Sequence, residues 1–189
     1  MKDTLKAFLN HFAPLSDRET NEVASLFRPV MIRRLDHLYK EGDNIKSLYY
    51  IHSGVMRGYY PKNGTEHTSS FYFGPTMMTD LPTIRDNTPT QMNMQALKDT
   101  ECYEADFNAV EQLAFSNPSL LRVFYSMFEH LLNELINRQV SFIYDTPRER
   151  YINLFKERPH IIAEIPQHYI ASYLGIQPET LSRIRKKIV

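Results

Sequence analysis

The sequence predicts an α+β fold in which short strands come first and long helices follow. From Pro29 to about Ala105, segments rich in β-branched and aromatic residues alternate with residues that favour turns. From Asp106 onward, the apolar residues recur at helical spacing instead. Several strands at short intervals are typical of a barrel or a sandwich. We therefore expect one β domain followed by a helical region.

A helix is expected before the β domain, and a tight hairpin within it. Ser16-Asp17-Arg18-Glu19 matches a capping box, which predicts a helix over about 16–27. Asn63-Gly64 is the strongest hairpin signal in the chain, because both residues tolerate positive φ. Strands are expected at 30–35, 48–52, 55–60, 65–73, 91–97 and 101–103.

A long helix is predicted after the strands. Pro118 starts a segment without a helix breaker that continues to Tyr144, a length of roughly 40 Å at the standard rise. Apolar residues form a stripe along it that only Arg138 interrupts, with a second apolar flank beside the stripe. Because so small a chain offers little to cover both sides, we expect two copies to pair as a homodimer. The alternative is a long core helix within a monomer. The residues expected at the dimer interface are Leu121, Phe124, Phe128, Leu131, Leu135 and Phe142.

Residues 166–188 have the pattern of two short helices joined by a turn. Ala171 is small where the two helices would meet, Gly175 suits the turn, and Pro178 favours the start of the second helix. This combination is typical of a DNA-binding helix-turn-helix. A helical hairpin with a polar outer face is the alternative interpretation. The residues expected on the inner face of the second helix are Leu181, Ile184 and Ile188.

The formal net charge is zero, but the charged residues are unevenly distributed. Residues 1–144 contain 14 Lys and Arg against 17 Asp and Glu, whereas residues 145–189 contain 8 against 5. An acidic body with a basic end is typical of nucleic-acid binders. A solvated helix end would show the same excess of cations, so the charge alone does not decide between the two interpretations.

The outer face of the second helix carries side chains that can contact DNA. Arg183 can donate two hydrogen bonds to guanine O6 and N7, and Glu179 can accept one from the amino group of cytosine. Polar and basic side chains around them can contact phosphates or base edges. These side chains are Gln167, His168, Tyr169, Gln177, Thr180, Ser182, Lys186 and Lys187.

The C-terminal motif closely resembles the helix-turn-helix of the Crp/Fnr family of transcription regulators, most of all in the family's short Bacteroidetes-type branch. The resemblance is carried by the run Ile170-Ala171-x-x-Leu174-Gly175-Ile176-x-Pro178-Glu179-Thr180-Leu181-Ser182-Arg183-Ile184-Arg185. Glu41-Gly42-Asp43 and the pattern Leu48-x-x-Ile51-x-x-Gly54 likewise resemble the opening of the family's effector domain, a β-roll of the cyclic-nucleotide-binding type.

The resemblance implies three parts: an effector-type jelly roll with flanking helices at 1–117, a long dimerisation helix at 118–144, and a helix-turn-helix domain at 145–189. It also implies that Glu179 and Arg183 contact bases. The expected partners are double-stranded DNA, a second copy of the chain and RNA polymerase. Because the sequence stops at Val189, directly after the motif, we expect no β-hairpin wing and a greater share of DNA contact for the second helix.

The effector segment departs from the family members that bind cyclic AMP, which carry a Gly-Glu pair followed by Arg-Ser or Arg-Thr. Residues 77–82 and 88–92 contain neither the Glu nor the Arg, so the charge-assisted phosphate contact is missing. We therefore do not expect cyclic AMP to bind and expect no cofactor, while an unidentified small-molecule effector stays open. The residues that could line its pocket are Thr79, Asp80, Thr90 and Gln91.

Other classes of function are disfavoured by features that the sequence lacks. Cys102 is the single cysteine, so we expect no iron–sulfur site. His37, His52 and His67 lie in the β region and leave haem sensing open as an alternative, but they have no ligand-like spacing, so we expect no metal site. We do not expect an enzyme, because no Gly-rich phosphate loop, nucleophile elbow or His-Glu-x-x-His pair is present. The alternative function is a ligand-binding or protein-interaction β-roll module without DNA-binding activity. The lone cysteine, with no signal sequence or long apolar run, predicts a cytoplasmic protein without membrane contact.

Overall fold

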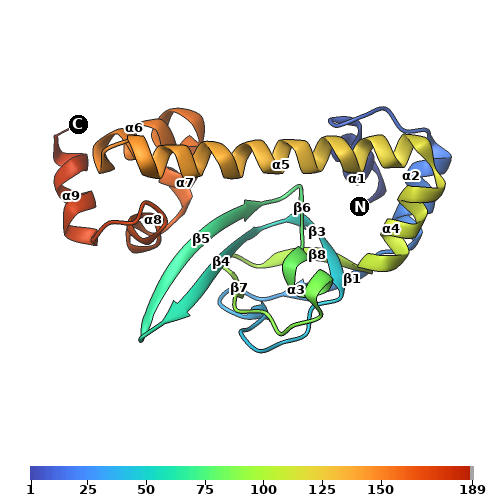
Figure 1. The fold of residues 1–189 in the computed structure, drawn as a ribbon, viewed down its shortest axis with the longest axis horizontal. Helices are drawn as coiled ribbons and strands as arrows, with labels where there is room; N and C mark the ends of the chain where they lie inside the picture. Colours follow the sequence, from blue (N-terminus) through green and yellow to red (C-terminus); the bar gives the residue numbers. More distant parts are fainter. Residues whose placement is uncertain (188–189) are drawn as a thin grey trace.

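The computed structural model describes residues 1–187, and one long helix extends across most of the molecule (Figure 1). This helix is α5 (Pro118–Tyr144), and the strands lie beneath it. Helices α1 (Lys2–Asn10), α2 (Asp17–Ser25) and α4 (Phe107–Ser116) gather at its start, and the C-terminal helices gather at its end. The structure confirms the predicted α+β fold.

The strands form two antiparallel four-stranded sheets. The first has the order β1 (Arg28–Ile32), β8 (Thr100–Asp106), β3 (Ser47–Ser53) and β6 (Thr76–Met78). The second has the order β2 (His37–Tyr39), β7 (Asn93–Ala96), β4 (Val55–Lys62) and β5 (Thr65–Phe73). Strand β5 therefore lies at the edge of its sheet.

The two sheets pack against each other through apolar side chains. Ile51 of β3 and Cys102 of β8 come from one sheet, and Met56 of β4 and Met94 of β7 come from the other. All four are fully buried in one cluster. Burial raises the pKa of the Cys102 thiol to about 12, as expected for a cysteine used in core packing.

The predicted hairpin is present, while some strand boundaries differ from the predictions. Asn63 and Gly64 join β4 to β5 with positive φ angles of 52° and 75°. The strand expected at 30–35 ends at Ile32, because the chain turns at Leu35, which also has positive φ. Sequence patterns did not predict the short strands β2 and β6 or helix α3 (Leu81–Asp86), since three to six residues are too few to show a period.

Local signals in the sequence explain where α2 and α5 begin. The side chain of Ser16 accepts a hydrogen bond from the backbone N–H of Glu19, whose carboxylate accepts one from the backbone N–H of Ser16, so the predicted capping box is present. Asn117 caps α5 by accepting hydrogen bonds from the backbone N–H groups of Ser119 and Leu120. Pro118 then occupies the first turn of α5, where its missing N–H costs nothing.

The C-terminal helices are α6 (Pro147–Glu157), α7 (Pro159–Glu164), α8 (Gln167–Tyr173) and α9 (Pro178–Lys186). A second capping box, between Thr146 and Glu149, starts α6. Pro166 precedes α8 as its N-cap rather than occupying its first turn. The inner face of α9 buries Leu181 and Ile184, whereas Ile188, also expected there, lies outside the described residues. Within the described residues, no helix is long and apolar enough to cross a membrane.

Candidate nucleic-acid interface

Helices α8 and α9 form the expected helix-turn-helix. Ala171 of α8 and Leu181 of α9 are buried in the same apolar cluster, which holds the two helices together. Gly175 makes the turn between them with a φ of +68°. This positive φ favours glycine. A Cβ atom at this position would come within 2.9 Å of Cε1 of Phe142, so the ring of Phe142, which is 43% exposed, would have to shift to admit a side chain.

The outer face of α9 presents polar and basic side chains to solvent. Glu179 lies in its first turn, and Arg183 lies one turn further along, so both project from one face. Thr180 is half-buried beside them. The exposed members of the predicted set on or next to α9 are Gln177, Glu179, Ser182, Arg183, Lys186 and Lys187.

The predicted contacts from α8 divide into two groups. Gln167 and His168 are exposed, and Gln167 lines a shallow hollow together with Ser182 and Lys186 of α9. Tyr169 is half-buried and turns toward the β domain, where its ring lies 3.8 Å from the guanidinium carbon of Arg57. The structure thus brings the predicted α9 residues and Gln167 together but directs Tyr169 elsewhere.

The four candidate effector residues differ in their surroundings. The Thr79 hydroxyl donates to the carbonyl of Ser47 at 2.9 Å. Asp80 caps α3, and its carboxylate accepts a hydrogen bond of 2.5 Å from the hydroxyl of Thr90, which is buried. Gln91 lines a separate surface hollow at the β4–β5 hairpin. Three of the four side chains therefore have structural hydrogen bonds.

The cation that α3 could offer to a cyclic phosphate is already paired within the structure. Arg85 of this helix pairs with Glu111 of α4, which raises the pKa of Arg85 and lowers that of Glu111. The carboxylate of Asp80 adds negative charge next to α3. Among the described residues, no group of three or more His, Cys, Asp or Glu side chains could hold a metal ion.

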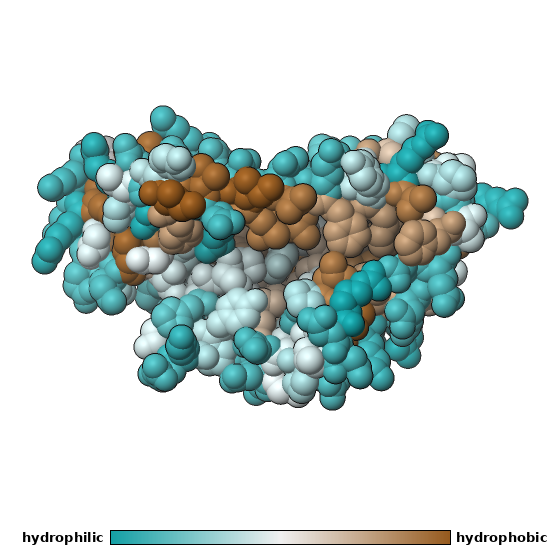
Figure 2. Space-filling model, viewed as in Figure 1, coloured by the Kyte–Doolittle hydropathy of each residue, from teal (hydrophilic) through white to brown (hydrophobic). Residues whose placement is uncertain are grey.

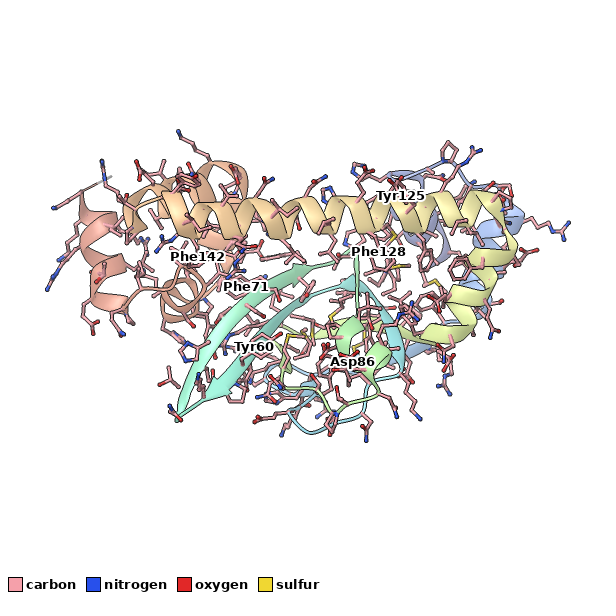
Figure 3. All side chains as sticks on the ribbon, in the orientation of Figure 1. Tyr60, Phe71, Asp86, Tyr125, Phe128 and Phe142 are labelled. Carbon is pink, nitrogen blue, oxygen red and sulfur yellow. The ribbon has the colours of Figure 1, made fainter. Side chains whose placement is uncertain are left out.

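The long helix α5 exposes a continuous apolar surface. Only Leu120 and Val123, near its start, are buried, and Phe124 is half-buried against the N-terminal core. Figure 2 shows apolar surface gathered over α5, and Figure 3 labels Phe128 and Phe142 on it. The predicted interface residues with more than two-fifths of their surface exposed are Leu121, Phe128, Leu131, Leu135 and Phe142.

Phe142 also has contacts within the chain. Its ring lies next to Gly175 of the helix-turn-helix and 4.7 Å from the guanidinium carbon of Arg150 in α6. Arg150 in turn donates hydrogen bonds to the carbonyls of Asp145 and Leu174. The end of α5 is therefore fixed to the turn of the motif.

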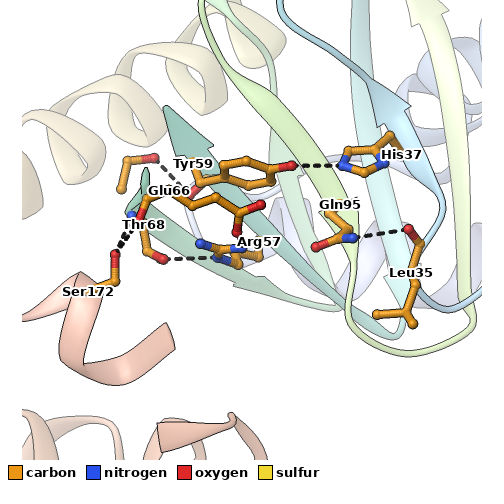
Figure 4. Close-up of polar contacts among 10 residues, drawn as sticks. Leu35, His37, Arg57, Tyr59, Glu66, Thr68, Gln95 and Ser172 are labelled. Atoms are coloured by element: carbon orange, nitrogen blue, oxygen red, sulfur yellow. Dashed lines mark hydrogen bonds and ion pairs between the residues drawn. The ribbon is translucent and has the colours of Figure 1, made fainter. Parts of the chain in front are cut away.

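A polar network that sequence analysis missed joins the β domain to α8 (Figure 4). The Ser172 hydroxyl accepts a hydrogen bond from the backbone N–H of Thr68 and donates one to the carbonyl of Glu66, both at 2.9 Å. Arg57, which is 1% exposed, donates to the hydroxyl of Thr68 at 2.9 Å and to the carboxylate of Glu66 at 2.6 Å.

Arg138 of α5 belongs to the same region. It donates hydrogen bonds to the carbonyls of Ser69 in β5 and Tyr173 in α8, and its guanidinium carbon lies 4.0 Å from the Tyr173 ring. Burial lowers the pKa of the Arg138 guanidinium. The only sequence signal for this role was a charged residue interrupting an apolar stripe.

Comparison with known proteins agrees with the fold and the motif. Residues 29–117 match the family model described as the cyclic nucleotide-binding domain. The anaerobic regulatory protein of Haemophilus influenzae is 27% identical over 188 residues, covering 90% of this chain and 70% of that protein. The transcriptional activator protein Anr of Pseudomonas protegens is 24% identical over 176 residues, covering 87% and 70%.

Two solved structures share the architecture across most of the chain. FixK2 from Bradyrhizobium japonicum gives a TM-score of 0.73 at 18% identity, covering 86% of this chain and 84% of that one. A CooA mutant from Carboxydothermus hydrogenoformans gives 0.72 at 18% identity, covering 97% and 83%. The first of these relatives is named as a regulatory protein and the second as a transcriptional activator. The chain therefore has a match to a cyclic nucleotide-binding domain at residues 29–117, and it is similar to these regulators in sequence along most of its length and to the solved structures in fold.

Proposed function

We propose that this chain is a homodimeric transcription regulator that binds specific DNA sequences through α9. The observation that carries the proposal is the outer face of α9, where Glu179 and Arg183 are exposed side by side among basic and polar residues. Because a helix of this kind fits the major groove, these two side chains would reach base edges. The expected place of action is the cytoplasm, where the DNA is.

The side chains around them have separate roles in the proposal. Arg183 would bind guanine, and Glu179 would accept a hydrogen bond from cytosine. Lys186 and Lys187 would neutralise phosphates, and Gln167 would contact the same backbone across the hollow that it shares with α9. Further contacts would come from His168, Gln177, Thr180 and Ser182. Tyr169 would contact DNA only after leaving Arg57, so we assign it no phosphate.

Pairing of two α5 helices would create the dimer. Burying one exposed leucine of the stripe contributes roughly 1.5–3 kcal/mol, and an exposed apolar surface of this extent usually marks an interface. Two copies related by two-fold symmetry would present their α9 helices to successive major grooves, about 34 Å apart. The DNA site would then be a pseudo-palindrome of two half-sites. RNA polymerase is a further partner expected of such a regulator.

We also propose that cyclic AMP is not the effector. The hydrogen bond between Asp80 and Thr90 and the ion pair between Arg85 and Glu111 use the polar groups of this segment for structure. A cyclic phosphate would meet the carboxylate of Asp80 without a free arginine to balance it. Titration of the purified protein with cyclic AMP should therefore release or absorb no binding heat, whereas saturable binding would contradict this part of the proposal.

Selection of binding sites from a randomised duplex pool tests the function directly. Wild type should recover a motif of two half-sites, and Arg183→Ala should lose the preference at one base pair, at a cost of about 1–3 kcal/mol. Arg18→Ala, which removes an exposed arginine of α2 far along the chain, is the matched control and should recover the wild-type motif. If neither wild type nor Arg183→Ala retains duplex DNA above background, the result would favour a β-roll module without DNA-binding activity. Equal, unselective binding by both proteins would refute the base-reading role of Arg183.

A further inference from the structure

The edge of strand β5 is covered by side chains from outside its sheet. On one side β5 pairs with β4, and on the other its backbone groups have no strand partner within residues 1–187. Ser172 of α8 satisfies the N–H of Thr68 and the carbonyl of Glu66, and Arg138 of α5 satisfies the carbonyl of Ser69. Helix α8 therefore occupies the place of a neighbouring strand, which protects an otherwise open edge.

A buried arginine next to this edge depends on the same helix. The guanidinium carbon of Arg57 lies close to two aromatic rings, 4.3 Å from the centroid of Tyr59 in β4 and 3.8 Å from that of Tyr169 in α8. Its charge is balanced by Glu66, whose side chain is half exposed. Removing Tyr169 would take away one of the two rings next to a cation that is now 1% exposed, so docking of α8 contributes to the environment of Arg57.

Apolar contacts extend the docking surface beyond the polar network. Val55 and Phe71 belong to the β domain but are buried in the cluster formed by the C-terminal helices. The ring of Phe71 lies 5.2 Å from that of Tyr173, and the ring of Phe73 lies 4.5 Å from that of His160. Separation of the β domain from the C-terminal helices would expose these side chains to water. Their burial therefore opposes free motion of the C-terminal helices relative to the β domain.

The docked arrangement leaves the candidate DNA-binding face of α9 open. Glu179, Ser182 and Arg183 are all exposed while Ser172 and Tyr169 contact the β domain. Docking and DNA contact thus use different faces of the motif. These contacts form entirely within one chain.

We propose that Ser172, together with Arg138 and Tyr169, positions the DNA-binding helices by fixing α8 to the edge of β5. Each α9 of the dimer is then held at a defined distance from the other without an effector. This inference rests on the proposed function. Two rigidly placed binding helices engage two half-sites with a high effective concentration, and loosening them reduces that advantage. Affinity for a single half-site does not depend on the placement.

Binding to three duplexes separates positioning from other roles. The duplexes are the selected two-half-site sequence, the same sequence with two base pairs inserted between the half-sites, and a single half-site. Ser172→Ala removes both hydrogen bonds from α8 to β5 without touching the outer face of α9. Ser182→Ala makes the same chemical change on that outer face and is the matched control. Hydrogen exchange of the Thr68 amide, followed without DNA, reports on docking itself.

For Ser172→Ala, we expect affinity for the two-half-site duplex to fall by about fivefold to tenfold. The loss of affinity caused by inserting two base pairs should be smaller for Ser172→Ala than for wild type. Affinity for the single half-site should stay within about twofold of wild type. The Thr68 amide should exchange faster in the variant. Ser182→Ala should weaken binding to all three duplexes by a similar factor.

The proposal is overturned if Ser172→Ala leaves two-half-site affinity unchanged, or raises it as release from an inhibitory contact would. An equal loss on the half-site, or unchanged exchange of the Thr68 amide, would overturn it too. If wild type binds no duplex, the proposed function fails and this inference fails with it. Faster exchange in Ser172→Ala would then still identify the contact as structural.

Discussion

Replacing Gly175 with alanine should destabilise the helix-turn-helix for two separable reasons. The backbone at this position has a φ of +68°, where an L-residue costs roughly 1–2 kcal/mol. The new methyl group would also lie 2.9 Å from Cε1 of Phe142; because this ring is 43% exposed and can shift, we expect a cost of about 1 kcal/mol, at the low end for overpacking. The free energy of unfolding should therefore fall by about 2–3 kcal/mol.

The variant Phe142→Leu separates the two causes. In the double variant Gly175→Ala/Phe142→Leu, the ring is absent, so the destabilisation caused by the contact between the new methyl group and the ring should be relieved. The destabilisation caused by the positive φ should stay unchanged. We expect a coupling free energy of about 0.5–1 kcal/mol in the double-mutant cycle.

Urea unfolding, followed by circular dichroism at one fixed protomer concentration, measures all four proteins. An unchanged unfolding midpoint for Gly175→Ala would refute the reasoning about the turn. Additive effects of the two substitutions would refute the contact with Phe142.

Two further predictions concern the dimer and the N-terminal capping box. Leu135→Glu should weaken the proposed dimer by a factor of about 100 or more in sedimentation, because the two leucines of that dimer would lose roughly 3 kcal/mol or more of burial. Asn137→Glu, on the opposite side of α5, should leave the proposed dimer intact. Hydrogen bonds from the Ser16 side chain and backbone lower the pKa of Glu19 to about 2. Because the ionised carboxylate stabilises the folded state, its contribution is present above the unfolded pKa near 4.5 and lost as the pH falls toward 2. The stability difference between wild type and Glu19→Gln should therefore shrink over this range in pH-dependent unfolding, and a constant difference would contradict the assignment.

Signals written in neighbouring residues determined much of this protein from sequence alone. The capping box at Ser16, the proline that opens α5, and the turn at Asn63-Gly64 all depend on contacts within a few residues. The helix-turn-helix followed equally from local spacing around Gly175 and Pro178. Periodicity likewise identified the outer face of α9, because residues one turn apart share a face of a helix.

Only the tertiary structure decided how α8 meets the β domain. Ser172 and Thr68 lie 104 positions apart in the chain, and no local pattern links them. Tyr169 had the position of a phosphate contact, yet folding places its ring on Arg57. Asp80, a candidate for an effector pocket, instead caps α3 and binds Thr90. Spacing and capping are set by adjacent residues, whereas these partners meet only after the sheets and helices have packed, so their roles could not be assigned before the fold was known.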